Sequence, residues 1–114
     1  MIQNMRGKLI EAGYPWRLRL EFTNSHYFGN QGTFTAHVRE HAEDPDIIVE
    51  LDSANGGVAL IDPTTIEIRI PATSPEIWPV DRTVVLDIVR TDGSQPEHLG
   101  VRLEIPVRTP VTRL

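Results

Sequence analysis

The sequence predicts an all-β protein, an antiparallel sandwich of about seven or eight short strands. Ten of the 114 residues are valine, eleven isoleucine and ten threonine, and β-branched side chains suit pleated strands better than helices. Apolar residues recur at alternate positions in most segments, and no segment has the 3.6-residue period of an amphipathic helix. Glycine and proline supply turn signals between these segments. The pattern favours an immunoglobulin-like sandwich, with a small barrel as the alternative.

The first half of the chain contains the clearest strands. Residues 16–22 alternate apolar and charged side chains, and residues 34–39 alternate again after a polar stretch. An apolar run at 47–51 precedes Asn-Gly-Gly at 55–57, which supplies the positive φ angles of a tight turn. We therefore expect a β-hairpin that joins the apolar run to residues 58–61.

The second half predicts three more strands. Residues 66–70 alternate after an Asp-Pro turn, and the prolines of residues 72–81 exclude a regular helix there. Residues 83–91 are the longest β-rich run and are expected to form a central strand, buried partly on both sides. Pro106 lies within the last alternating run, 101–107. Because proline removes a ladder hydrogen bond, this strand is expected at a sheet edge or at a bulge.

Composition indicates one domain and excludes several function classes. Residues 1–114 are expected to form a single sandwich, with 1–8 and 109–114 as tails. There is no cysteine, so disulfides and thiol chemistry are excluded. The net charge of −5 argues against nucleic acid as a partner. No signal-peptide pattern and no long apolar run is found, which predicts folding in the cytoplasm and no membrane association.

No motif for catalysis, for a cofactor or for a metal stands out. His37 and His41 are four residues apart, which on a strand places them about 13 Å apart, too far to share an ion. The acidic segment 40–46 lacks the ligand spacing of an EF-hand. Nucleophile elbows, phosphate loops and zinc-protease helices are missing as well. The protein is therefore expected to be no enzyme and to bind neither cofactor nor metal.

Charges of both signs occupy the expected outer faces of the strands: Arg17, Arg19, Glu21, Glu67, Arg69, Arg102 and Glu104. Opposite charges on neighbouring strands can pair there. Ten arginines stand against one lysine. This bias either equips the surface for bidentate contacts with carboxylates of a protein partner, or follows from genome base composition.

Four aromatic residues fall near loops rather than on strand faces: Tyr14, Tyr27, Phe28 and Trp78. We predict that loops 23–31 and 72–81 contact a partner, because they hold apolar residues outside the strand alternation. The predicted contact residues are Tyr27, Phe28, Ile77 and Trp78. A second interpretation is that Trp78 plugs one end of the core.

Several short segments resemble a pattern of small bacteriophage and prophage proteins. In the C-terminal third these are DIVRTDG at 87–93, Leu-Gly at 99–100 and Val-Thr-Arg at 111–113. Residues 32–39 and 55–60 are similar to an earlier strand and hairpin of such chains, and Thr64-Thr65 to a threonine before the next strand. The resemblance covers most of residues 16–113. The start departs from it, since Arg6-Gly7-Lys8 replaces the usual opening and 23–31 replaces a short turn.

The resemblance implies a non-enzymatic virion protein with an immunoglobulin-like or similar sandwich. It would belong to the tail, baseplate, neck or head, and its partners would be other virion proteins or further copies of itself. Its location would be the virion, after folding in the host cytoplasm. The alternative function is a carbohydrate-binding sandwich that uses Tyr27, Phe28 and Trp78 as stacking platforms.

Overall fold

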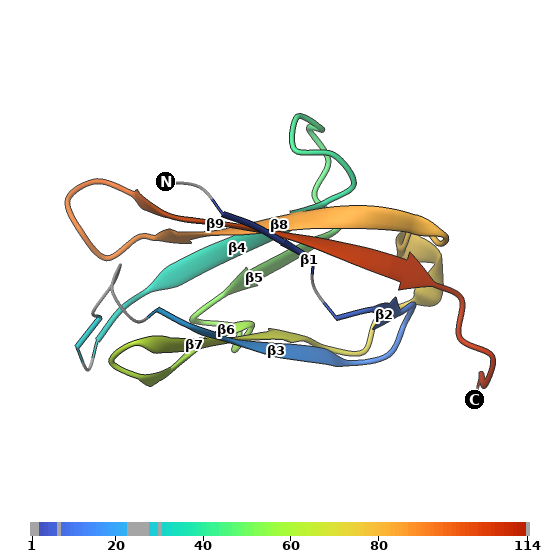
Figure 1. The fold of residues 1–114 in the computed structure, drawn as a ribbon, viewed down its shortest axis with the longest axis horizontal. Helices are drawn as coiled ribbons and strands as arrows, with labels where there is room; N and C mark the ends of the chain where they lie inside the picture. Colours follow the sequence, from blue (N-terminus) through green and yellow to red (C-terminus); the bar gives the residue numbers. More distant parts are fainter. Residues whose placement is uncertain (1–2, 7, 23–27, 30, 114) are drawn as a thin grey trace.

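The computed structural model describes residues 3–6, 8–22, 28–29 and 31–113, with the backbone alone for residues 3–6. Within these ranges the chain forms nine strands and one 3₁₀ turn (Figure 1). The elements are β1 (Gln3–Arg6), β2 (Ile10–Glu11), β3 (Trp16–Glu21), β4 (Phe34–Arg39), β5 (Val49–Asp52), β6 (Val58–Asp62), β7 (Thr65–Ile70), η1 (Pro75–Ile77), β8 (Arg82–Arg90) and β9 (Glu97–Arg108). No helix in the described part of the chain is long and apolar enough to span a membrane.

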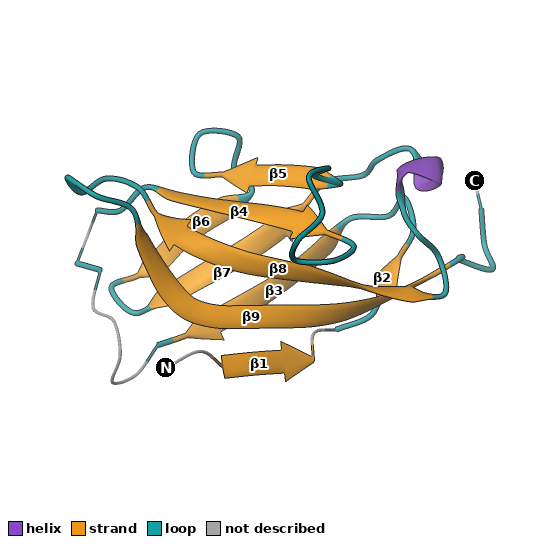
Figure 2. Ribbon diagram, turned by 90° about the horizontal axis from the view of Figure 1, so that it is seen from above, coloured by secondary structure: helices purple, strands orange, loops and turns teal. Residues whose placement is uncertain are grey.

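The strands form two facing sheets, which confirms the predicted all-β sandwich (Figures 1 and 2). The large sheet has the order β1-β9-β8-β4-β5, with β2 also paired to β9, and the small sheet has the order β3-β7-β6. Strands β4, β8 and β9 correspond in order to strands C, F and G of an immunoglobulin-like sandwich, and β3, β7 and β6 correspond to B, E and D. Strand β8 is central, as predicted, between β9 and β4.

The core lies between the sheets and is built from the alternating positions of the strands. In β4 the apolar side chains are buried and the intervening ones are half-buried. In β8 three aliphatic side chains are buried in the same alternating way. The largest fully buried side chains include Phe34, Ile66, Ile68, Leu86 and Leu103. A two-residue period therefore sorts most side chains between core and surface.

The prediction of a β-hairpin around residues 55–57 is wrong. A turn does lie there, with Gly56 at φ +80°, but β5 pairs with β4 in the large sheet and β6 pairs with β7 in the small one. The Asn55 side chain stabilises the turn through hydrogen bonds with the backbone of Asp52 and Gly57. The turn residues thus carry the chain from one sheet to the other.

The last strand is neither at an edge nor bulged at Pro106, which pairs in continuous register with Thr83, so a second prediction is wrong. Strands β1 and β2 run parallel to β9 on the side away from β8. Residues 3–6, expected in a tail, therefore form a strand, because β9 has an open ladder that they can complete. Pro106 lies between the stretches of β9 that pair with β1 and β2. Its missing N–H thus falls where the neighbouring strand is interrupted. Residues 109–113 contain no strand.

Candidate functional site

Phe28, one of the predicted contact residues, belongs to the core. It is 5% exposed, and its ring meets Phe22 and Phe34 edge-to-face at centroid distances of 5.5 and 5.2 Å. Its backbone N–H donates to the Pro63 carbonyl at 2.6 Å. The Phe28 side chain turns inward because three aromatic rings can pack together there. Tyr27 lies outside the described residues.

Trp78 is also buried, at 5% exposure, which confirms the interpretation of it as a plug for one end of the core. Its indole Nε1–H donates to Thr73 Oγ1 at 2.8 Å, so the polar end of the ring is satisfied inside the loop. Ile77 beside it is 41% exposed. The carbohydrate interpretation therefore loses Phe28 and Trp78 as stacking platforms, since a sugar cannot reach buried rings.

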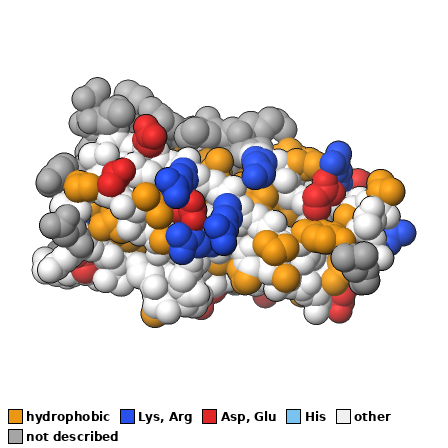
Figure 3. All heavy atoms as spheres, turned by 90° about the horizontal axis from the view of Figure 1, so that it is seen from below, with side chains coloured by type: hydrophobic (Ala, Val, Ile, Leu, Met, Phe, Trp, Pro, Cys, Tyr) orange, Lys and Arg blue, Asp and Glu red, His pale blue; other side chains and the backbone are white. Residues whose placement is uncertain are grey.

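One end of the sandwich carries an open, largely apolar hollow of about 590 Å³. Its walls come from residues 12–15 before β3, residues 72–80 between β7 and β8, and residues 109–113 after β9. A second hollow of about 630 Å³ shares Tyr14 with it and continues along the C-terminal segment. We call the following lining residues the end surface: Tyr14, Pro15, Pro75, Val80, Pro110 and Val111. Figure 3 shows hydrophobic side chains gathered toward this end.

Hydrogen bonds hold the three segments of the end surface together. The Thr73 N–H donates to the Gly13 carbonyl at 3.1 Å, and Gly13 adopts φ +91°, which favours glycine. The Ala12 N–H donates to the Arg108 carbonyl at 2.9 Å. The Tyr14 hydroxyl donates to the Thr112 carbonyl at 2.6 Å. The end surface is therefore a connected part of the fold rather than three independent loops.

The structure places only part of the predicted contact loops at this surface. Among the described residues, the large exposed apolar side chains are Ile47, Ile77, Val80 and Val111, and the last three lie in segments that form this end. Loop 72–81 supplies part of this end: Val80 and the buried Trp78 line the hollow, while Ile77 is exposed beside it. Sequence reasoning noted Tyr14 as an aromatic residue near a loop but missed Pro15 and residues 109–113. Proline beside an apolar residue, as at Pro110-Val111, was the available signal.

The outer face of the small sheet carries a second cluster, which we call the arginine face: Arg17, Arg19 and Arg69 around Glu67. Strand register places Arg19 opposite Glu67 and Arg17 opposite Arg69. Arg19 Nε donates to Glu67 Oε2 at 2.8 Å, and Arg69 Nε donates to Glu67 Oε1 at 2.5 Å. Figure 3 shows the basic side chains grouped around an acidic one. Glu67 points outward as predicted, yet it is only 6% exposed.

The two guanidinium groups act directly on the acid–base behaviour of Glu67. Hydrogen bonds from Arg19 and Arg69 stabilise its carboxylate and lower its pKa from the ordinary 4.5 to about 2. Burial of the side chain opposes this shift but does not cancel it. Glu67 is therefore charged throughout the neutral and mildly acidic range, and it holds both arginines in place.

This pKa shift predicts a pH dependence of stability. Because the pKa of Glu67 is lower in the folded chain, its contribution is complete above pH 4.5 and is lost as the pH falls toward 2. We expect Glu67→Gln to lower the free energy of unfolding at neutral pH. The variant should also lose less of that free energy than wild type does as the pH falls from 4.5 to 2. Urea unfolding followed by circular dichroism across this range measures both effects. Glu43→Gln, in an exposed loop, should keep the wild-type profile; a Glu67→Gln profile parallel to wild type would refute the assignment.

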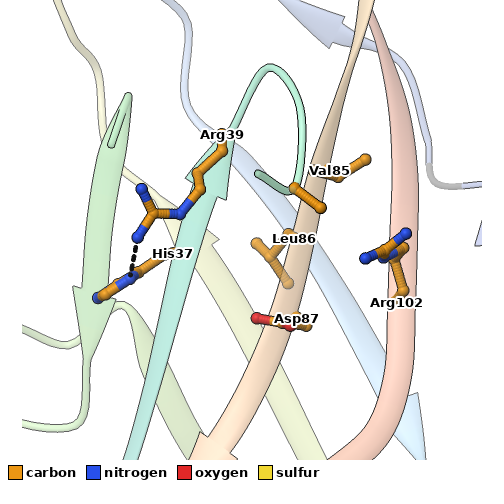
Figure 4. A pocket seen from close by; sticks show the side chains of 7 residues that line it. His37, Arg39, Val85, Leu86, Asp87 and Arg102 are labelled. Atoms are coloured by element: carbon orange, nitrogen blue, oxygen red, sulfur yellow. Dashed lines mark hydrogen bonds between the residues drawn. The ribbon is translucent and has the colours of Figure 1, made fainter. Parts of the chain in front are cut away.

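The outer face of the large sheet has a third, smaller feature (Figure 4). A shallow hollow of about 50 Å³ lies between His37 and Arg39 on β4, Asp87 on β8 and Arg102 on β9. His37 Nε2 lies 3.1 Å from Glu50 Oε2, and an Arg39 terminal nitrogen lies 3.3 Å from His37 Nδ1. These neighbours already use much of the polar capacity of the hollow, and its volume admits little more than water.

The described histidines do not gather. His37, His41 and His98 each lie within 3.4 Å of a single carboxylate, those of Glu50, Asp44 and Asp87. His26 lies outside the described residues. Over the described ranges, no group of three histidine, aspartate or glutamate side chains has the geometry of a metal site.

Comparisons with family models, with curated proteins and with solved structures found no match for this chain. The observations that bear on function are therefore the fold, the end surface and the arginine face.

Proposed function

We propose that this chain is a virion structural or assembly protein of a bacteriophage or prophage, that it acts through protein–protein contacts rather than catalysis, and that it docks through the end surface. The observation that carries the docking proposal is the gathering of exposed apolar side chains from three distant segments. Val80 is 38% exposed and Val111 is 94% exposed. Single exposed apolar residues are ordinary, but a contiguous apolar patch is typical of an interaction site.

The surroundings of the end surface fit a protein interface. Protein interfaces combine an apolar centre with a polar rim. Glu76 and Arg113 line the first hollow, and the Glu11–Arg108 ion pair, with Nε to Oε2 at 2.7 Å, borders the second. The hydrogen bonds between the segments reduce the conformational entropy that binding would otherwise remove. Such a surface suits an apolar anchor from a folded partner.

The phage setting rests on the resemblance of the C-terminal third. The Val-Thr-Arg segment at 111–113 belongs to that resemblance and also contributes to the end surface. The proposed partners are therefore the tail, baseplate, neck or head proteins encoded beside this chain. A gene neighbourhood without such proteins would remove the support for the virion setting while leaving the docking surface intact.

Charged substitutions in the end surface test the docking proposal. We expect Val111→Asp and Val80→Asp each to weaken binding to a virion protein encoded beside this chain by about tenfold or more. The reason is that binding would remove the new carboxylate from water in place of an apolar side chain. Co-purification after co-expression, followed by titration calorimetry, measures the loss. Ile47→Asp is the matched control, because Ile47 is 40% exposed in the β4–β5 connection. If all three variants bind as wild type does and melt at the same temperature, docking occurs elsewhere.

A further inference from the structure

The arginine face is a preorganised cationic surface on an acidic protein. Its three arginines and one glutamate leave two positive charges in excess, while the whole chain carries −5. Arg17 lies directly opposite Arg69, a like-charge arrangement that destabilises a sheet unless an anion compensates it. Arg17 is exposed and forms no ion pair with any described residue. The excess positive charge of the face therefore lies around Glu67, while the exposed Glu21 lies two positions beyond Arg19 at the end of β3.

The arginines leave donors free toward solvent. Arg19 and Arg69 each donate to Glu67 through Nε. Their terminal nitrogens donate to no side chain among the described residues. A guanidinium group has five N–H donors in a planar fork that matches a carboxylate. Glu67 therefore orients the guanidinium groups of Arg19 and Arg69, and both of its carboxylate oxygens are occupied by them. Arg17 adds a third guanidinium group to the face. A carboxylate-bearing protein segment is the ligand class that this arrangement fits.

The chain itself carries such a segment in the β4–β5 connection. Residues 40–46 contain four acidic side chains. Asp44 fixes the turn, because its carboxylate accepts the His41 N–H and its carbonyl accepts an Arg39 terminal N–H. Glu43 and Asp46 are exposed and pair with no described basic side chain. The turn therefore presents two free carboxylates from a fixed backbone.

The two complementary surfaces lie on opposite layers of the sandwich. Figure 1 shows the β4–β5 connection standing out from the large sheet, on the side away from the small sheet. The loop of one molecule therefore cannot reach its own arginine face. Both surfaces of one molecule remain free to engage neighbours at the same time.

We propose that a second copy of this chain docks on the arginine face through its acidic 40–46 loop. The contact is head-to-tail, so each copy offers a loop to one neighbour and an arginine face to another. Such heterologous contacts build rings or open filaments. The contact is separate from the end surface and depends on charge rather than on apolar burial.

Analytical ultracentrifugation of the full chain tests this at about 0.05 M and about 0.5 M NaCl, because salt screens exposed charge pairs. We expect wild type to self-associate at low salt and to dissociate at high salt. Arg17→Glu, and separately Glu43→Lys with Asp46→Lys, should each weaken association by about tenfold or more. An equimolar mixture of the two variants should restore it, because each supplies a surface that the other lacks. Lys8→Glu carries the same charge change as Arg17→Glu at an exposed position outside both surfaces, and it should associate as wild type does.

Several results would overturn the proposal. One is a wild-type protein that stays monomeric at low salt. Another is association that survives Arg17→Glu or the loop variant. Loss of association on Arg17→Glu, with the loop variant unaffected, would show that the arginine face binds a different acidic segment of the second copy. Retention of a single-stranded oligonucleotide by wild type but not by Arg17→Glu, without self-association, would assign it to phosphate. Association that persists at high salt and disappears with Val111→Asp would belong to the end surface instead.

Discussion

Phe28→Ala is expected to lower the free energy of unfolding by about 3 to 5 kcal/mol, the usual cost of removing a buried aromatic side chain. Phe28 was predicted from sequence to contact a partner, yet its ring lies between Phe22 and Phe34. The Arg90 guanidinium carbon lies 5.8 Å from the centre of the same ring. Removing the ring leaves a cavity that the surrounding sheets cannot fill. Urea unfolding monitored by circular dichroism measures the change.

Ile77→Ala is the matched control for Phe28→Ala. Both residues come from the predicted contact set, but Ile77 is 41% exposed and should lose less than about 1 kcal/mol. A partner that binds through the end surface should still bind folded Phe28→Ala under native conditions. A Phe28→Ala variant as stable as wild type but deficient in partner binding would show that the ring faces a partner after all.

Gly57→Ala is expected to cost about 1 to 3 kcal/mol or more, because the added methyl group has no space. A Cβ at this position would lie 2.6 Å from Leu51 Cβ and 2.9 Å from Asn55 Oδ1. Leu51 is almost fully buried in the large sheet. The Gly57 carbonyl accepts the Arg69 N–H at 2.8 Å, so the backbone is held by the small sheet as well. Leu51 cannot move without disturbing the large sheet, and the backbone of Gly57 cannot move without disturbing the small one. Thermal and urea unfolding measure the loss.

Gly56→Ala separates crowding from backbone strain. Gly56 adopts φ +80° but has open space around its missing Cβ, so its alanine variant should lose only about 1 to 2 kcal/mol, the strain of a left-handed residue. Leu51→Ala keeps Cβ but removes Cδ2, which would lie 2.7 Å from the added methyl group, so the double variant should cost less than the sum of the two single variants. If Gly57→Ala proves the milder of the two glycine variants, contact with Leu51 does not limit this position.

The strands were the most predictable part of the fold. Burial alternates along residues 16–21 and 34–39 as the sequence alternates, because a core on one side selects every second side chain. The partner of each strand was less predictable. Asn-Gly-Gly at 55–57 is a turn signal, but a turn can join strands of one sheet or of two. The choice depends on contacts such as Leu51 with Gly57, which no local pattern shows.

The surface clusters required the register of the strands. Sequence alternation correctly placed Arg19, Glu67 and Arg69 outward, but it could not show that β3 and β7 are neighbours that set Arg19 opposite Glu67. The burial of Glu67 follows from two guanidinium groups that cover it, which is a tertiary effect. The loops were the least predictable part, because an aromatic residue outside the alternation can turn inward, as Trp78 does by donating to Thr73.

The parallel pairing of β1 with β9 has a consequence for how the chain reaches its native state. Gln3 pairs with Val101, so strands from opposite ends of the described chain must meet before the large sheet is complete. Contacts so distant in sequence carry a high loop-closure cost and slow folding. During translation β1 emerges first and must wait, without its partner, until β9 has been made. We expect the ladder between β8 and β9, which are adjacent in sequence, to form first, and β1 to close the sheet last.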